Sequence, residues 1–128
     1  LLTCFEAFEH FAEPAAELEN LLSISRNILL STEFIPEPPP SPEDWWYYGL
    51  KHGQHIGFFQ KKTFEYLANK HSLYFYTNGQ NIHLLSEKRF PTPAFKWLAK
   101  VSKYMTPLIQ KRMSSLTWKD FETLKAQS

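Results

Sequence analysis

The first 32 residues place an apolar run, a helical pattern and a second apolar run in direct succession. The first run is residues 1–5 and the second is Ile28-Leu29-Leu30-Ser31-Thr32. Between them, Glu13-Pro14 is typical of a helix start, because proline in a first turn loses no hydrogen bond. Strand, helix and strand within about 35 residues predict a parallel crossover unit, so we expect an α/β protein.

Two more strands are expected after a Pro-rich connection. Residues 36–42 contain five prolines and are predicted to be neither helix nor central strand. Apolar residues at helical spacing predict a helix over residues 61–71. The turn signal Asn78-Gly79 separates apolar runs at 73–77 and 82–86, which predicts an antiparallel pair.

The last third of the chain is predicted to be helical. A long helix after Pro93 has an apolar stripe, which we expect to be buried: Phe95, Leu98, Val101, Met105, Leu108 and Ile109. Pro107 is expected to kink or split this helix. Residues 117–120 have the spacing of a capping box for a short last helix. We therefore expect residues 1–90 to form a partial domain and residues 91–128 its C-terminal helical extension.

Composition narrows the class of protein. A chain of 128 residues that is 43% hydrophobic excludes intrinsic disorder, and no apolar run is long enough to span a membrane. A single cysteine, Cys4, forms no internal disulfide and favours a reducing, cytoplasmic compartment. Residues 1–65 carry a net charge of −6 and residues 66–128 one of +7. The basic residues are spread out, which favours a solvated helix face over a surface for an anionic partner such as nucleic acid. Since no apolar run can span a bilayer, we expect no membrane partner either.

Three ligand-type side chains follow the first strand: Glu6, Glu9 and His10. Ligands of open α/β sheets bind beyond the carboxyl ends of strands, and carboxylates with imidazole suit a divalent cation. His55 and His52 are candidates for a further ligand, and His55 is alternatively a general base. The structural alternative is that Glu6 hydrogen-bonds the backbone, Glu9 is solvated and His10 packs against the next helix.

Aromatic residues and one further histidine complete the inventory. Trp45, Trp46, Tyr47 and Tyr48 are adjacent, and they either form a lid that stacks on a substrate or pack as a satellite of the core. His83 lies in a predicted strand and is interpreted as a structural histidine. The sequence has no Gly-x-Ser-x-Gly elbow, no phosphate-binding glycine loop and no paired cysteines for zinc.

The order of these features resembles that of a known family. The segment Cys4-Phe5-Glu6-Ala7-Phe8-Glu9-His10, then Glu13-Pro14 and a helix, then residues 27–32, resembles the fourth and fifth strands of class I S-adenosylmethionine-dependent methyltransferases. The antiparallel pair resembles their sixth and seventh strands, so the likeness covers residues 1–86. Within this family, Glu-x-x-Glu-His is similar to the cluster of ubiquinone-pathway O-methyltransferases and small-RNA 3′-end methyltransferases.

The resemblance implies a Rossmann-like sheet, an activity and a set of site residues. The activity is methyl transfer from S-adenosylmethionine, expected to be O-methylation of a small organic or sugar-like acceptor. The implied ligands of a divalent metal ion are Glu6, Glu9, His10 and His55. Of these, His10 and His55 are also the candidate catalytic residues. Phe5 and Glu6 are the implied contacts to the cofactor, and residues 45–48 the substrate lid.

The family's glycine-rich loop and its ribose-binding acidic residue have no counterpart in these residues. We therefore expect the chain to be a fragment of a longer enzyme and inactive alone. The alternative is a non-catalytic scaffold or interaction domain derived from the same fold. A partial sheet has a free strand edge, which predicts self-association.

Overall fold

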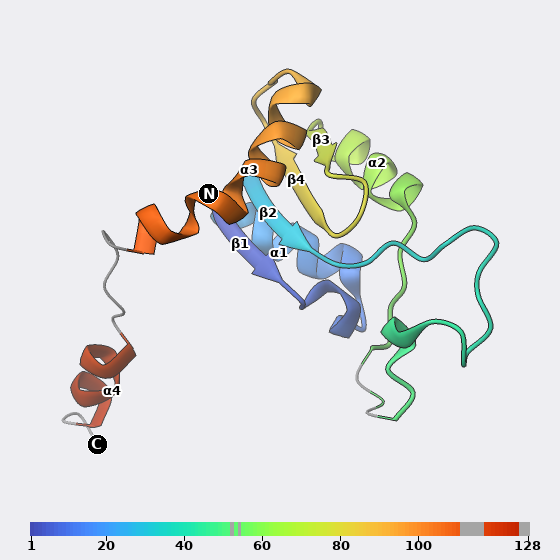
Figure 1. Ribbon diagram of the computed structural model, residues 1–128, viewed down its shortest axis with the longest axis horizontal. Helices are drawn as coiled ribbons and strands as arrows, with labels where there is room; N and C mark the ends of the chain where they lie inside the picture. The colour runs from blue at the N-terminus through green and yellow to red at the C-terminus, as the bar shows by residue number, and fades with distance from the viewer. Residues whose placement is uncertain (52, 54, 111–116, 126–128) are drawn as a thin grey trace. The chain divides into compact units, whose positions relative to one another are not determined.

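The computed structural model describes residues 1–51, 53, 55–110 and 117–125, apart from the side chains of 103, 106–110, 117, 119 and 120. The chain divides into two compact units, Leu1–Trp97 and Leu98–Ser128. The elements follow in the order β1 (Leu2–Phe5), the 3₁₀ helix η1 (Phe8–His10), α1 (Pro14–Ile24), β2 (Asn27–Ser31), the 3₁₀ helix η2 (Trp46–Tyr48), α2 (Lys61–Lys70), β3 (Tyr74–Thr77), β4 (Ile82–Ser86), α3 (Thr92–Gln110) and α4 (Thr117–Lys125) (Figure 1).

Four strands form one mixed sheet in the order β1-β2-β4-β3. β1 pairs parallel with β2, whereas β4 is antiparallel to both β2 and β3. β1, β2 and β3 therefore run in the same direction, and β4, the last of these four strands in sequence, is inserted between β2 and β3. The predicted parallel crossover and the predicted antiparallel pair are both confirmed, and the protein is α/β.

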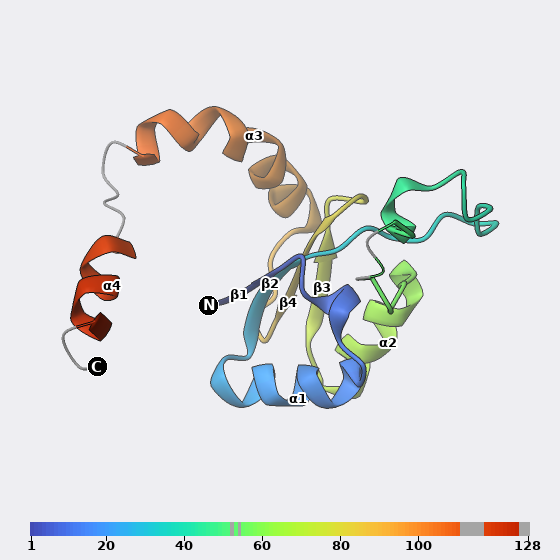
Figure 2. The same cartoon turned by 90° about the horizontal axis from the view of Figure 1, so that it is seen from below.

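One face of the sheet is covered by α1 and α2 (Figure 2). Side chains alternate along β2, so Ile28 and Leu30 are fully buried on this face while Leu29, on the other, is only half-buried. Burial of each such side chain stabilises the fold by roughly 1.5–3 kcal/mol. The helices add Leu18 from α1 and residues of α2 to the same core. This core holds the ends of the strands in place, and the candidate site is built at one of those ends.

Local sequence explains where α1 begins. Pro14 is its first residue, preceded by Glu13 in a non-helical conformation, as the Glu13-Pro14 pair predicts. Cys4 of β1 is buried in the core among apolar neighbours. Burial, and secondarily the charge of Glu9, raises the pKa of its thiol above the ordinary value.

His83 of β4 is fully buried on the helix-covered face. Its Nδ1 lies 2.8 Å from the Thr77 hydroxyl, and its Nε2 lies 3.0 Å from the Thr32 carbonyl oxygen. Phe34 stacks on its ring at 4.2 Å between centroids. Burial lowers the pKa of His83 to about 4, so the ring is neutral and Nε2 donates to the carbonyl. The interpretation of His83 as a structural histidine is confirmed.

The opposite face of the sheet is only partly covered within the first unit. Tyr76 is buried there against the rings of Phe90 and Phe95, at 5.1 Å and 6.1 Å between centroids. Phe5 is 52% exposed, and Tyr74 is exposed as well. This face of the sheet is therefore less completely covered than the face under α1 and α2.

The C-terminal helices agree with the prediction in their positions but not in their packing. α3 continues through Pro107 to Gln110, and α4 is the predicted short last helix. The expected buried stripe of α3 is wrong for Leu98 and Met105, which are 59% and 43% exposed. The side chains of Leu108 and Ile109 lie outside the described residues. Among the described residues, every helix lacks the length or the apolarity that crossing a bilayer requires.

Candidate metal centre

The chain turns sharply where β1 ends. Glu6 has φ of 46°, in the left-handed region that non-glycine residues seldom adopt. Its amide donates to the carbonyl oxygen and the hydroxyl of Ser31, at 3.3 Å and 2.9 Å. The Ser31 hydroxyl in turn donates to Glu6 Oε1 at 2.6 Å. These bonds hold the exposed Glu6 side chain against β2.

A buried aromatic ring fixes the short helix that follows. Phe8 is fully buried, and its ring lies 5.4 Å from that of Phe64 and 5.5 Å from that of Phe59. With Phe8 anchored in the core, the next two residues of η1 differ in exposure: Glu9 is 0% exposed, whereas His10 is exposed. The structural alternative, in which Glu9 is solvated, is therefore wrong.

The segment ahead of α2 brings His55 to the same place. The amides of Ile56 and Gly57 both donate to the carbonyl oxygen of Glu9, at 2.8 Å and 3.0 Å. A Cβ on Gly57 would lie 3.0 Å from Phe59 Cζ, so any larger residue here would press on the Phe59 ring. Because His55 directly precedes Ile56, these two hydrogen bonds hold His55 close to the end of η1.

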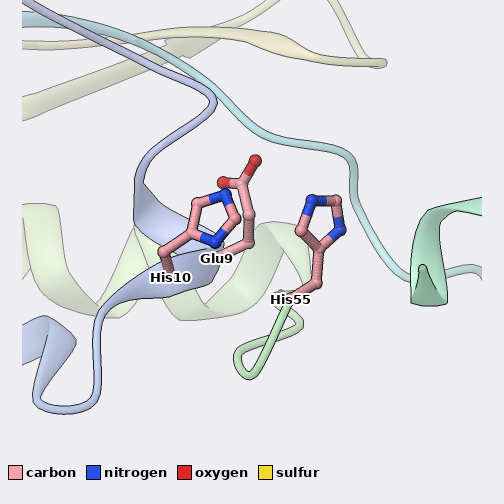
Figure 3. A group of neighbouring side chains, drawn as sticks. All are labelled: Glu9, His10 and His55. Carbon is pink, nitrogen blue, oxygen red and sulfur yellow. The ribbon is translucent and has the colours of Figure 1, made fainter. Parts of the chain in front are cut away.

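Three side chains converge at this point: Glu9, His10 and His55 (Figure 3). One ligand-type atom from each lies within 4.8 Å of the others, and the two imidazole rings are 5.0 Å apart between centroids. One carboxylate and two imidazoles form a mixed oxygen and nitrogen donor set, which suits zinc and other transition metals. Three protein ligands leave further coordination positions for water or a substrate.

The two carboxylate oxygens of Glu9 have different surroundings. Oε1 accepts a hydrogen bond of 2.7 Å from the Tyr47 hydroxyl. Oε2 is buried and has no hydrogen-bond partner among the described residues. A buried carboxylate oxygen without a partner is destabilising by roughly 1–3 kcal/mol or more. A cation held with His10 and His55 would satisfy this atom, so the residues present fit a divalent metal ion.

The structure brings together three of the four predicted metal ligands. Glu6 is held instead by Ser31 and is not part of the group. His52, the other candidate, lies outside the described residues. Phe5 and Glu6, the implied cofactor contacts, are both exposed at the carboxyl end of β1.

The four adjacent aromatic residues have different environments. Trp46 is 77% exposed, whereas Tyr47 is buried and Trp45 and Tyr48 are partly buried. Trp45 and Tyr48 pack on each other and on Phe58, with ring centroids 4.9–5.7 Å apart. Trp46 is thus the most solvent-exposed of the four.

Sequence reasoning assigned Tyr47 to a substrate lid and missed its contact with Glu9, and it did not single out Thr32 as a site residue. Tyr47 contacts Glu9 through its hydroxyl, and Thr32 lies 3.2 Å from the same hydroxyl. Burial is the largest influence on the Tyr47 hydroxyl and raises its pKa, outweighing the opposing effect of the hydrogen bond with Thr32, so the hydroxyl remains protonated and donates. No local pattern marks either contact, because Tyr47 lies far from Glu9 in the sequence and Thr32 lies far from Tyr47.

Comparisons of this chain with protein-family models, with curated proteins and with solved structures found no match.

Proposed function

We propose that this chain is the C-terminal half of a Rossmann-like S-adenosylmethionine-dependent methyltransferase, and that Glu9, His10 and His55 form its metal centre. The observation that carries the proposal is the buried, unpartnered Oε2 of Glu9 beside two imidazoles, at the carboxyl end of a parallel strand. The order of the strands supports it, because the crossover pair continues into an antiparallel pair as the resemblance implies.

The chain's residues would supply alignment and proton transfer. In methyl transfer to a hydroxyl, an oxygen–carbon bond forms as the sulfonium–carbon bond breaks in line, and the hydroxyl proton leaves to a base. His10 is exposed and next to His55, so either imidazole can accept that proton where no metal is bound. A divalent cation, when bound, would lower the pKa of the acceptor hydroxyl.

The acceptor side is expected to be the loop that carries His55. Exposed apolar side chains lie on this loop and on the turn before it: Trp46, Leu50 and Ile56. A cavity of about 450 Å³ is lined by Trp45, Trp46 and Leu50 together with Glu43 and Lys51. Aromatic surface with charged residues at its edge suits a small organic or sugar-like acceptor. We expect O-methylation of such a molecule.

Titration of the full chain with Co²⁺ tests the metal centre. We expect one ion per chain, and we expect Glu9→Gln to lose most of the affinity because the uncharged amide is a poor ligand. Glu13→Gln is the matched control, since it removes the same charge from an exposed residue four positions away. Unchanged Co²⁺ binding in Glu9→Gln would reject the assignment of Glu9.

Titration with S-adenosylmethionine, followed by amide resonances in nuclear magnetic resonance spectra, tests the methyltransferase assignment. We expect the amide resonances of Phe5 and Glu6 to shift at millimolar concentrations of the cofactor. The Phe5→Ala substitution should weaken binding and so reduce the shift of the Glu6 resonance. Tyr74→Ala, which removes another exposed aromatic ring from the same sheet face, should leave it unchanged. If the amide resonances of Phe5 and Glu6 do not shift when the cofactor is added, the proposal is contradicted and the alternative of a non-catalytic scaffold is favoured.

A further inference from the structure

Tyr47 occupies a central position between two of the candidate ligands. It is 1% exposed and belongs to η2, which is far in sequence from η1 and precedes the loop of His55. Its ring lies 4.5 Å from the His55 ring between centroids. Its hydroxyl lies 2.7 Å from Glu9 Oε1, and its carbonyl oxygen lies 2.6 Å from His55 Nδ1. One residue thus contacts both ligands, through two different groups.

The hydroxyl contacts define the direction of each hydrogen bond. The tyrosine hydroxyl has a single hydrogen, and an ionised carboxylate can only accept. Tyr47 therefore donates to Glu9 Oε1, and the 3.2 Å contact with Thr32 is made by the threonine hydroxyl donating to Tyr47. This arrangement occupies Oε1 and leaves Oε2 as the ligand atom of Glu9.

The carbonyl contact defines the tautomer of His55. A carbonyl oxygen has no hydrogen to give, so Nδ1 of His55 must donate and carries the proton. In the neutral ring, Nε2 then has the free lone pair that a metal requires. In Figure 3, one ring nitrogen of His55 is turned toward Glu9 and the other is turned away from it.

We propose that Tyr47 is a positioning residue of the metal centre, which orients Glu9 through its hydroxyl and sets the tautomer of His55 through its carbonyl. This inference rests on the proposed function, since it takes Glu9 and His55 as ligands. Groups that hold metal ligands in this way typically contribute 10- to 100-fold to metal affinity. Tyr47 thereby has a role other than that of a substrate lid.

Tyr48 provides a matched control within the same short helix. Its hydroxyl donates to the carbonyl oxygen of Pro40 at 3.0 Å, in a contact that includes none of the three ligands. Tyr47→Phe and Tyr48→Phe each remove one hydroxyl and keep the ring. They differ in that only Tyr47→Phe frees a carboxylate oxygen of Glu9.

The test is a Co²⁺ titration of the full chain and both variants, followed by the visible absorption bands of the ion. We expect Tyr47→Phe to bind Co²⁺ about 10- to 100-fold more weakly with altered bands, and Tyr48→Phe to match the wild type. Equal affinity and bands in Tyr47→Phe and wild type would overturn the proposal while leaving the metal centre in place. A wild-type chain that binds no Co²⁺ would reject the centre as well as the role of Tyr47.

A measurement on the wild-type chain decides the question if Tyr47→Phe does not fold. Long-range ¹H–¹⁵N spectra of the metal-free protein, at a pH where imidazole is neutral, report which nitrogen of His55 carries the proton. We expect protonation at Nδ1. Protonation at Nε2 would overturn the proposal. Neither experiment uses S-adenosylmethionine, so their outcome is separate from the cofactor test of the proposed function.

Discussion

The amide of Ile56 lies 2.8 Å from the carbonyl oxygen of Glu9 and donates a hydrogen bond to it. With the parallel bond from Gly57, it joins the loop of His55 to the short helix that carries Glu9 and His10. The candidate ligands are therefore held together by backbone bonds as well as by their own side chains. Because backbone contacts do not depend on a bound ion, we expect the group to be largely preformed without metal.

Gly57→Ala should weaken the site by moving this loop. The new Cβ would lie 3.0 Å from Phe59 Cζ, and the buried Phe59 ring has little room to move. Overpacking of this kind typically costs about 1–3 kcal/mol of stability. We expect lower stability in urea denaturation together with weaker Co²⁺ binding.

The control for this substitution is Gly79→Ala. Gly79 has φ of +89° and open space around it, so alanine there is strained but remote from the site. It should lower stability by roughly 1–2 kcal/mol and leave Co²⁺ affinity unchanged. If Gly57→Ala binds Co²⁺ as tightly as the wild type, the loop does not position His55.

Stability should fall as the pH is lowered through the range set by His83. The pKa of this residue is about 4 in the folded chain, compared with the ordinary 6.5. Between these two pH values the unfolded chain binds more protons than the folded chain does. The stabilisation that His83 contributes to the folded state is therefore fully present above pH 6.5 and is lost by about pH 4. A shift of this size corresponds to about 3 kcal/mol.

Urea denaturation across this pH range measures the effect, and His83→Gln should flatten the dependence. If that variant does not fold, nuclear magnetic resonance titration of the His83 ring in the wild type is the alternative measurement. A ring that titrates near pH 6.5 would disprove the prediction. The groups packed on His83 are aromatic or hydroxyl-bearing, so its burial is the expected cause of the shift.

Cys4 should react with thiol reagents only when the chain unfolds. Its side chain is buried, and burial raises its thiol pKa, so little thiolate is present or accessible in the folded state. We expect labelling by a chromogenic disulfide to accelerate when urea is added. Rapid labelling of the folded chain would show that the end of β1 opens in solution.

The free edge of the sheet should cause the isolated chain to self-associate. Among the described residues, β1 pairs on one side only, with β2, and Phe5 is exposed beside that edge. Thr3→Lys, a charge in the middle of β1, should favour the monomer, whereas Ser23→Lys on α1 should not. Sedimentation at increasing concentration measures this, and a monomer at every concentration would contradict it.

Much of the fold was predictable because the decisive signals are local. The Glu13-Pro14 pair marks the start of α1, and the Asn78-Gly79 turn with its flanking apolar runs marks β3 and β4. The packing of α3 was not predictable in the same way. Helical periodicity shows that Leu98 and Met105 share a face, but it carries no information about what covers that face.

The candidate site was predictable in part for the same reason. Glu9 and His10 follow a strand directly, so their spacing pointed to a common site; His55 was one of two candidates for a further ligand, and the resemblance favoured it. Glu6 was assigned to the group because sequence spacing does not reveal its left-handed turn toward Ser31. Tyr47 was assigned to a substrate lid, and its contact with Glu9 was missed because that contact joins two short helices that no local pattern relates.

The position of β4 has a consequence for how this protein is made. The strand that is synthesised last among the four occupies an interior place, bonded to neighbours on both sides. A nascent chain that has emerged only as far as Thr77 has two strand edges facing each other with nothing between them. The sheet can therefore close only after Ser86 has left the ribosome, and until then the growing chain must avoid aggregating through those edges.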